Sequence, residues 1–283
     1  MPATILVART IPALRRAIAG FHSAGETVAL VPTMGALHAG HLALVRRAGR
    51  QADRVVVSIF VNPAQFAPRE DLASYPRRFR RDVAVLAPHR VDLVWAPPVT
   101  VMYPEGFATR IMPQGAASVG LEDAFRPHFF SGVTTVVTKL LVQCMPDAAV
   151  FGEKDYQQLK VVMQMSRDLN FPVKIIGAPI VREKDGLAMS SRNDYLSPKE
   201  RAIAPMLHRV LKGCAGKIRE GRRVQDVLVQ GRDALRRAGF AVDYLEARHA
   251  ETLQPMPSQR KGPLRLLAAA KIGRTRLIDN VAV

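Results

Sequence analysis

Two histidines three residues apart, His38 and His41, follow the apolar run TVALVP (residues 27–32) in the stretch PTMGALHAGH. If a helix begins near Gly40, both imidazoles lie on one face of its first turn, beside the unpaired backbone N–H groups that favour phosphate. Two imidazoles at that place can donate hydrogen bonds to negative charge that develops on a phosphorus centre. The pair by itself is equally consistent with two histidines that meet at a helix start by chance.

Two further stretches carry groups that suit phosphate. Lys154, in FGEKDYQQL (residues 151–159), follows a strand end and a glycine, where open parallel sheets bind their ligands, and its ammonium group is a point charge for a phosphate. In AMSSR, Ser190, Ser191 and Arg192 combine two hydroxyls and a forked guanidinium, a compact clamp for a polyphosphate on a loop that we expect to be mobile. Taken singly, the lysine could be a solvated surface residue and the S-S-R tripeptide an ordinary loop.

The elements that must position these residues alternate along the first part of the chain. Five apolar runs are rich in Val and Ile and nearly continuous, as strands buried on both faces are, and they span residues 27–32, 54–62, 91–97, 148–152 and 173–181. Four stretches between them have helical spacing, at residues 41–52, 71–89, 132–144 and 156–170. This alternation predicts an α/β fold with a parallel sheet.

The second part of the chain has a different pattern. SPKE (residues 197–200) is a capping box that starts a helix, and a second helix over residues 224–238 ends at Gly239. Three stretches then predict antiparallel strands packed on those helices, at residues 241–248, 263–272 and 275–283. We therefore expect a catalytic domain over residues 1–182 and a smaller α+β domain over residues 183–283.

Bulk composition limits the function classes. At 283 residues the chain has room for two domains, because single cores stop growing near about 250–300 residues. The net charge of +17 is interspersed and no basic run alternates with stacking aromatics, which favours a solvated basic surface over a nucleic-acid groove. No apolar run reaches the ~18–20 residues of a membrane span and the N-terminus does not look like a signal peptide, so we expect a cytoplasmic protein.

The two cysteines carry no recognisable site. Cys144 and Cys214 lie far apart in the sequence, without a C-x-x-C pattern or nearby histidines. A disulfide framework or a zinc site is therefore not expected, and reduced thiols are.

The motif around the paired histidines extends beyond them. HAGH matches the His-x-Gly-His signature of the nucleotidylyltransferases, and PTMGALHAGHLALVRRA (residues 32–48) resembles the pantothenate synthetase family in particular. Four further blocks match in order over nearly the whole chain: SIFVNPAQF (58–66), YPR (75–77), FGEKDYQQL (151–159) and REKDGLAMSSRNDYLS (182–197). The resemblance implies a Rossmann-like catalytic domain with parallel strands and a homodimer with residues 58–62 and 75–77 near its interface.

This resemblance implies an ATP- and Mg²⁺-dependent condensation of pantoate with β-alanine, through a pantoyl adenylate, to pantothenate, AMP and pyrophosphate. His38, His41 and Lys154 would be the catalytic residues that offset charge. The ATP site implied by the family includes those three residues together with Met34, Gly35, Ala36, Leu37, Ala39, Gly40, Gly152, Glu153, Asp155, Val181, Met189, Ser190, Ser191 and Arg192.

The other substrates and the metal have candidates as well. Gln65 and Gln158 are neutral donors and acceptors that suit hydroxyls and a carboxylate, although either glutamine alone would pass for ordinary surface. By resemblance both would bind pantoate, its methyl groups would face Met34 and Phe60, and Asn62 with Gln65 would orient the attack of β-alanine. Asp82 is a candidate metal ligand, against the alternative of a surface aspartate on an amphipathic helix.

One segment departs from the family pattern. The family has approximately L-E-G-x-x-R-P-x-H-F-x-G-V, whereas this chain has LEDAFRPHFFSGV (residues 121–133). Asp123 stands in place of the glycine, Phe129 in place of the histidine, and His128 comes one residue earlier. The departure affects the expected specificity more than the chemistry, because each phosphate-facing block is intact.

Two other function classes fit parts of the pattern. Aminoacyl-tRNA synthetases share the His-x-Gly-His turn, but the part after residue 182 leaves little room for an anticodon-reading module. A non-enzymatic nucleotide-binding protein would have no use for Lys154 together with both histidines.

Overall fold

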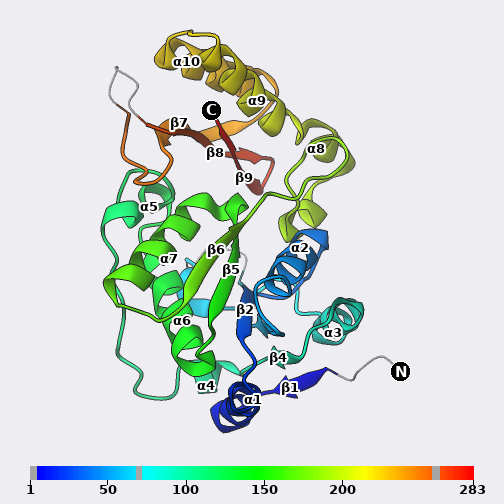
Figure 1. The fold of residues 1–283 in the computed structure, drawn as a ribbon. Helices are drawn as coiled ribbons and strands as arrows, with labels where there is room; N and C mark the ends of the chain where they lie inside the picture. The colour runs from blue at the N-terminus through cyan, green and yellow to red at the C-terminus, as the bar shows by residue number, and fades with distance from the viewer. Residues whose placement is uncertain (1–4, 68–71, 257–261) are drawn as a thin grey trace.

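A computed structural model describes residues 5–67, 72–256 and 262–283, and position 71 of the helix expected over residues 71–89 lies outside them. A six-stranded sheet forms the centre of the first part of the chain (Figure 1), and its neighbouring strands are parallel in the order β1-β4-β3-β2-β5-β6. The strands are β1 Leu6–Ala8, β2 Val28–Thr33, β3 Arg54–Ile59, β4 Leu93–Trp95, β5 Ala148–Gly152 and β6 Lys174–Ala178. The predicted parallel α/β sheet is confirmed.

The order of the strands places the predicted site. β3 and β4 lie on one side of β2, whereas β5 and β6 lie on the other. Ligands of open parallel sheets bind beyond the carboxyl ends of the strands at such a switch point. The turn with His38 and His41 follows β2, and Lys154 follows β5, so the topology brings two distant segments to one edge of the sheet.

Helices cover both faces of this sheet, as its alternating core residues require. Leu30 of β2 packs in a core with α1, α6 and α7, whereas the next residue, Val31, packs in a core with α2 and α3. The helices of this part are α1 Ile11–Ser23, α2 Ala39–Ala48, α3 Phe79–Leu86, α4 Val99–Met102, α5 Glu122–Phe125, α6 Phe129–Cys144 and α7 Tyr156–Asp168. Both faces of the central strands are therefore buried, as their continuous apolar runs predict.

The second part forms a three-stranded antiparallel sheet with helices on it. Its elements are α8 Pro198–Ile203, α9 Met206–Arg219, α10 Val224–Arg237, β7 Ala241–His249, β8 Leu264–Ile272 and β9 Thr275–Ala282, with strand order β7-β8-β9. The capping box predicted at Ser197 and Glu200 is present. One face of the sheet packs on α9 and α10, whereas Tyr244 and Leu267 reach the core of the first part, so the two sheets are packed together (Figure 1).

Several predicted element ends were wrong. The strand expected to reach residue 181 ends at Ala178, because Pro179 has no N–H for a ladder. The helix expected over residues 71–89 consists of α3 and a short 3₁₀ turn, and the strand expected to residue 62 stops at Ile59. β1 and α1 were not assigned from sequence, although Thr10 caps α1 and Pro12 lies in its first turn. The domain boundary near residue 183 stays a prediction.

Two expectations concern features of the whole chain. Cys144 and Cys214 are buried free thiols, so no disulfide joins them, and burial raises the pKa of Cys144 to about 12. Over the described residues, the structure contains no helix with the length and apolar character needed to cross a membrane.

Candidate active site

A cleft of about 900 Å³ opens beyond the carboxyl ends of β2 and β5, and β9 of the C-terminal sheet contributes to its wall. Most predicted site residues meet there: Met34, His38, Gly40, His41, Phe60, Asn62, Gln65, Gly152, Lys154, Asp155, Gln158, Val181, Met189, Ser190, Ser191 and Arg192. Of the described residues predicted for the site, Gly35, Ala36, Leu37, Ala39, Glu153 and Asp82 do not line this cleft.

The two histidines cap the helix that carries them. His38 is the N-cap of α2, and its Nδ1 accepts a hydrogen bond from the backbone N–H of Gly40 at 3.1 Å. His41 Nδ1 accepts one from the backbone N–H of His38 at 3.3 Å, which closes a capping box made of imidazoles. A Cβ at position 40 would lie 2.7 Å from His38 Cε1, so a side chain there would displace the capping imidazole.

These contacts set the tautomer and charge of both rings. Because each Nδ1 is an acceptor, the hydrogen of each neutral ring is on Nε2. Burial lowers the pKa of His38 to about 4 and, together with the neighbouring His38 ring and Lys154, lowers that of His41 to about 3. The ring centroids are 4.1 Å apart. The pair is therefore neutral at pH 7 and offers two N–H donors that the helix caps hold in place.

Lys154 lies in the short 3₁₀ helix η4 (Glu153–Asp155), directly after β5. Its side chain is 21% exposed, and its Nζ lies 3.9 Å from a carboxylate oxygen of Asp155. The ammonium group is therefore partly desolvated on the same edge of the sheet as the histidine pair. This arrangement suits an anionic ligand that spans the two strand ends.

The Ser-Ser-Arg segment also borders the cleft. Residues 182–188 fold back through an isolated bridge between Arg182 and Ala188, and the N–H of Met189 donates to the Val181 carbonyl at 3.0 Å. Ser190 then caps the 3₁₀ helix η5 (Ser191–Tyr195) and accepts the N–H of Arg192 at 3.3 Å. The mobility expected for this segment stays a prediction.

Asp82 is buried, so the interpretation as a surface aspartate was wrong. Its two carboxylate oxygens accept the backbone N–H groups of Ala36 at 3.1 Å and Leu37 at 2.9 Å. That turn contains two left-handed residues, Gly35 with φ 81° and Ala36 with φ 51°. Asp82 therefore holds a strained turn that leads into the histidine motif. In the part of the chain that the structure describes, no group of three or more His, Cys, Asp or Glu residues could hold a metal.

Asn62 is a support for Gln65. Asn62 Nδ2 donates to Gln65 Oε1 at 3.0 Å and to the Gly132 carbonyl at 3.2 Å, and Asn62 Oδ1 accepts the Tyr103 hydroxyl at 2.7 Å. Gln65 Nε2 then donates toward the Met34 sulfur at 3.3 Å. A Cβ at position 132 would lie 2.3 Å from the Ala64 carbonyl oxygen, so glycine allows α6 to approach this turn.

The divergent segment has its own set of contacts. Asp123 accepts the N–H groups of Gly120 at 2.8 Å and Leu121 at 3.0 Å, and the Gln157 amide at 2.9 Å. These hydrogen bonds outweigh desolvation and lower the pKa of Asp123.

Phe129, which stands where the family has histidine, lines the cleft, and the Arg126 guanidinium lies 3.9 Å from its ring centroid. His128 is not among the described residues that line the cleft. Phe129, rather than His128, therefore borders the cleft.

One polar cluster of the cleft was missed from sequence. The Glu122 carboxylate accepts the Tyr244 hydroxyl at 2.8 Å and Arg276 Nη1 at 2.8 Å, while Arg276 Nε donates to Asp243 at 2.7 Å. Burial, reinforced by Glu122, raises the pKa of Tyr244. Glu122 appears in the sequence only as part of the divergent motif, and its partners from β7 and β9 share no local pattern with it. No sequence signal therefore pointed to the cluster.

Fold and cleft together define the class: a Rossmann-like α/β protein with a cleft at the switch point of its sheet, lined by neutral and cationic hydrogen-bond donors. Comparison of the sequence with known protein families identifies one family within this class. The family described as Pantoate-beta-alanine ligase matches residues 6–282, and the chain belongs to that family.

Relatives named pantothenate synthetase are similar to this chain over nearly its whole length. Pantothenate synthetase of Nitrobacter hamburgensis is 63% identical over 100% of both chains, and that of Rhodopseudomonas palustris is 62% identical over 98% of each. The crystal structure of pantothenate synthetase from Thermus thermophilus has a TM-score of 0.92 at 48% identity and covers 98% of this chain and 99% of its own. A pantoate-beta-alanine ligase from Francisella tularensis, complexed with "Beta-gamma ATP" and β-alanine, has a TM-score of 0.80 at 33% identity over 98% and 97%.

Proposed function

We propose that this protein condenses pantoate with β-alanine at the expense of ATP and forms pantothenate, AMP and pyrophosphate through a pantoyl adenylate. The observation that carries the proposal is the meeting of the histidine pair and Lys154 at the adjacent ends of β2 and β5, in a chain that matches the ligase family from residue 6 to 282. The nucleotide and β-alanine named for the Francisella relative support the choice of these two substrates.

The first step needs little acid–base chemistry. The carboxylate of pantoate, with a pKa of ~3.5 like other α-substituted acids, is already ionised at neutral pH and can attack the α-phosphorus without a general base. A bond forms between the carboxylate oxygen and phosphorus, and the bond to the pyrophosphate oxygen breaks. The protein must then offset charge on the phosphorus oxygens and on the departing pyrophosphate.

The cleft provides donors of two kinds for this task. The Nε2–H groups of His38 and His41 are neutral donors held by the helix cap, and Lys154 supplies a full positive charge. Neutral imidazoles stabilise developing charge without competing for the ligand's protons, because their pKa values lie far below 7. Ser190, Ser191 and Arg192 would hold the departing phosphates. Gly35, Ala36, Leu37, Ala39 and Glu153 would contribute through the backbone of the turns that carry these groups.

The second step joins the amine. β-Alanine attacks the pantoyl carbonyl carbon as a free amine and the new C–N bond forms. The amine nitrogen releases one proton to solvent, and AMP leaves with the electrons of the single bond between the carbonyl carbon and the phosphate oxygen. Gln65 and Gln158 would bind pantoate against Met34 and Phe60, and Asn62 would act by holding the Gln65 amide in one orientation. Because water would hydrolyse the mixed anhydride, closure of the segment around Ser190 over the cleft would protect it.

Mg²⁺ enters this scheme with the nucleotide. The described residues offer no three-ligand cage, and both oxygens of Asp82 already accept backbone N–H groups. Mg²⁺ usually keeps several waters and binds through substrate phosphates, so a dedicated cage is unnecessary. We assign no step to the metal and no metal ligand to Asp82.

The remaining parts of the proposal concern the assembly and its surroundings. We infer a cytoplasmic homodimer with residues 58–62 and 75–77 near its interface, and no nucleic-acid partner. Light scattering with size-exclusion chromatography tests the dimer. A labelled-tRNA titration at physiological salt tests the synthetase alternative, because non-specific phosphate contacts weaken steeply with salt.

The adenylation half-reaction tests the function directly. With ATP, Mg²⁺ and pantoate alone, the enzyme should exchange labelled pyrophosphate into ATP and release about one pyrophosphate per active site in a burst. Lys154→Ala should slow this adenylation by ~10²-fold with a smaller effect on pantoate affinity, because it removes a donor used mainly in the transition state. Lys212→Ala, at an exposed position of α9, is the matched control. Exchange that strictly requires β-alanine would contradict the two-step scheme.

A further inference from the structure

Two adjacent residues near the end of the chain, Asp279 and Asn280 of β9, contact the start of the segment that leads to Ser190 and the turn that carries Lys154, respectively. Their side chains are buried, with 3% and 2% exposure, so water does not compete for their hydrogen bonds. Successive side chains of a strand point to opposite faces, which lets two neighbours hold two different segments. Neither residue belongs to the predicted site.

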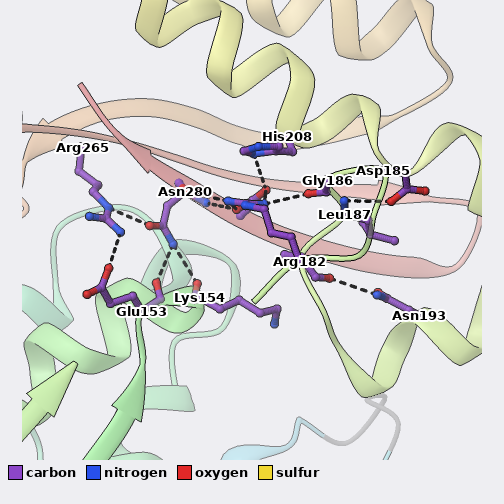
Figure 2. Close-up of polar contacts among 12 residues, drawn as sticks. Glu153, Lys154, Arg182, Asp185, Gly186, Leu187, Asn193, His208, Arg265 and Asn280 are labelled. Atoms are coloured by element: carbon purple, nitrogen blue, oxygen red, sulfur yellow. Dashed lines mark hydrogen bonds and ion pairs between the residues drawn. The ribbon is translucent and has the colours of Figure 1, made fainter. Parts of the chain in front are cut away.

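Asn280 holds the turn that carries Lys154. Its Nδ2 donates to the carbonyl of Glu153 at 2.8 Å and to the carbonyl of Lys154 at 3.1 Å (Figure 2). Its Oδ1 accepts Arg265 Nε at 2.8 Å, and Arg265 Nη2 donates onward to the Glu153 carboxylate at 3.1 Å. The amide is thereby fixed in one orientation, and two carbonyls of η4 are satisfied by a residue from the other sheet.

Asp279 holds the start of the segment that leads to Ser190. Arg182 donates to both of its carboxylate oxygens, at 2.7 and 2.9 Å, and donates to the Gly186 carbonyl at 3.1 Å. His208 Nδ1 of α9 lies 3.5 Å from the same carboxylate. These partners outweigh burial and keep the pKa of Asp279 low, so the ion pair with Arg182 is present at neutral pH.

The two sets of contacts join through one short piece of strand. η4 and η5 both pack against β9, so the backbone between residues 279 and 280 connects the Lys154 turn with the Ser190 segment. We propose that Asp279 and Asn280 are positioning residues for adenylation, which set the placement of Lys154 relative to Ser190–Arg192. This inference rests on the proposed function, because it assigns those two segments to the phosphates of one nucleotide.

The first test uses the half-reactions. Asn280→Ala should slow pantoyl-adenylate formation on the order of 10- to 100-fold, because a displacement of Lys154 by about 1 Å is enough for such a loss. β-Alanine added after the adenylate has accumulated should react at the wild-type rate, because the attack of the amine does not use the displaced ammonium group of Lys154. Asn280→Asp keeps the oxygen that Arg265 binds but removes the two N–H donors to the carbonyls of Glu153 and Lys154. It should therefore slow adenylation at least as much as Asn280→Ala.

A double-mutant cycle separates positioning from stability. If Asn280 acts through Lys154, adding Asn280→Ala to Lys154→Ala should slow adenylation by less than twofold beyond the single mutant. Val281→Ala, at the next position of β9, is the control for general loosening, because Val281 packs in the second core and does not line the cleft among the described residues. If the two single-mutant reductions in adenylation rate multiply in the double mutant, Asn280 does not act through Lys154 and the proposed role is wrong.

The role of Asp279 is tested with asparagine, which has nearly the same size and shape but no charge. Asp279→Asn should raise the apparent Kd for ATP about tenfold and slow adenylation, while the rate of aminolysis stays the same. Adding Arg182→Gln to Asp279→Asn should change the Kd for ATP and the adenylation rate little further, because the two side chains form one ion pair. Equal slowing of both half-reactions, matched by Val281→Ala, would overturn the inference. A wild-type enzyme without pyrophosphate exchange would instead overturn the proposed function.

Discussion

His38 and His41 cap the same helix with one ring nitrogen each, and the ring centroids lie 4.1 Å apart. The cap explains why two histidines are spaced by three residues around a glycine. Each Nδ1 is committed to a backbone N–H, which leaves each Nε2–H as the donor that a ligand can meet.

Both rings should remain neutral far below the usual pKa of histidine. Their folded pKa values, about 4 and about 3, lie below the value of 6.5 expected when unfolded. The unfolded chain therefore binds more protons between about pH 6.5 and pH 3, and the contribution of the pair to stability is complete above pH 6.5 and falls as the pH is lowered. Nitrogen NMR of ¹⁵N-histidine-labelled protein should show two Nε2–H tautomers at pH 5. Protonation of either ring near pH 6.5 would contradict this prediction.

Asp82 should matter for the turn and not for the metal. Asp82→Ala leaves the partly buried N–H groups of Ala36 and Leu37 without their acceptor, at a cost of about 1 kcal/mol for each group. We expect a lower free energy of unfolding, measured in urea, and a raised apparent Kd for ATP at saturating Mg²⁺. Asp82→Asn keeps one strong acceptor and should lower the free energy of unfolding by less than Asp82→Ala does. Unchanged stability with a shift only in the Mg²⁺ requirement would favour a metal ligand instead.

The divergent segment should tolerate loss of its histidine. Because Phe129 lines the cleft beneath Arg126, His128→Ala should leave the turnover of pantoate within about twofold of wild type, and Phe129→His should not increase it. Asp123→Gly, which restores the family residue, removes three hydrogen bonds and should lower the free energy of unfolding by about 1–3 kcal/mol. Steady-state kinetics and urea unfolding test these substitutions. An activating Phe129→His would show that the family histidine has a role this chain has lost.

The sequence alone determined the features that depend on residues close together in the chain. Alternating apolar runs predicted the parallel sheet, the capping box at Ser197 predicted the start of α8, and the His-x-Gly-His turn, Lys154 and Ser190–Arg192 were assigned from short motifs. These signals are readable because helix periodicity, strand burial and caps act over a few residues.

Only the tertiary structure decided how those motifs are held. The turn before His38 is held by Asp82 from α3, Glu122 by residues of β7 and β9, and Lys154 through its backbone by Asn280. The sequence even favoured an exposed position for Asp82, because α3 is amphipathic and an aspartate is usually solvated. Such partners come from distant parts of the chain and share no period or spacing with the residues that they hold. The pairing of Asp82 with its turn exists only after α3 has packed on the first sheet, and the contacts of Glu122 and Asn280 exist only after the two sheets have packed together.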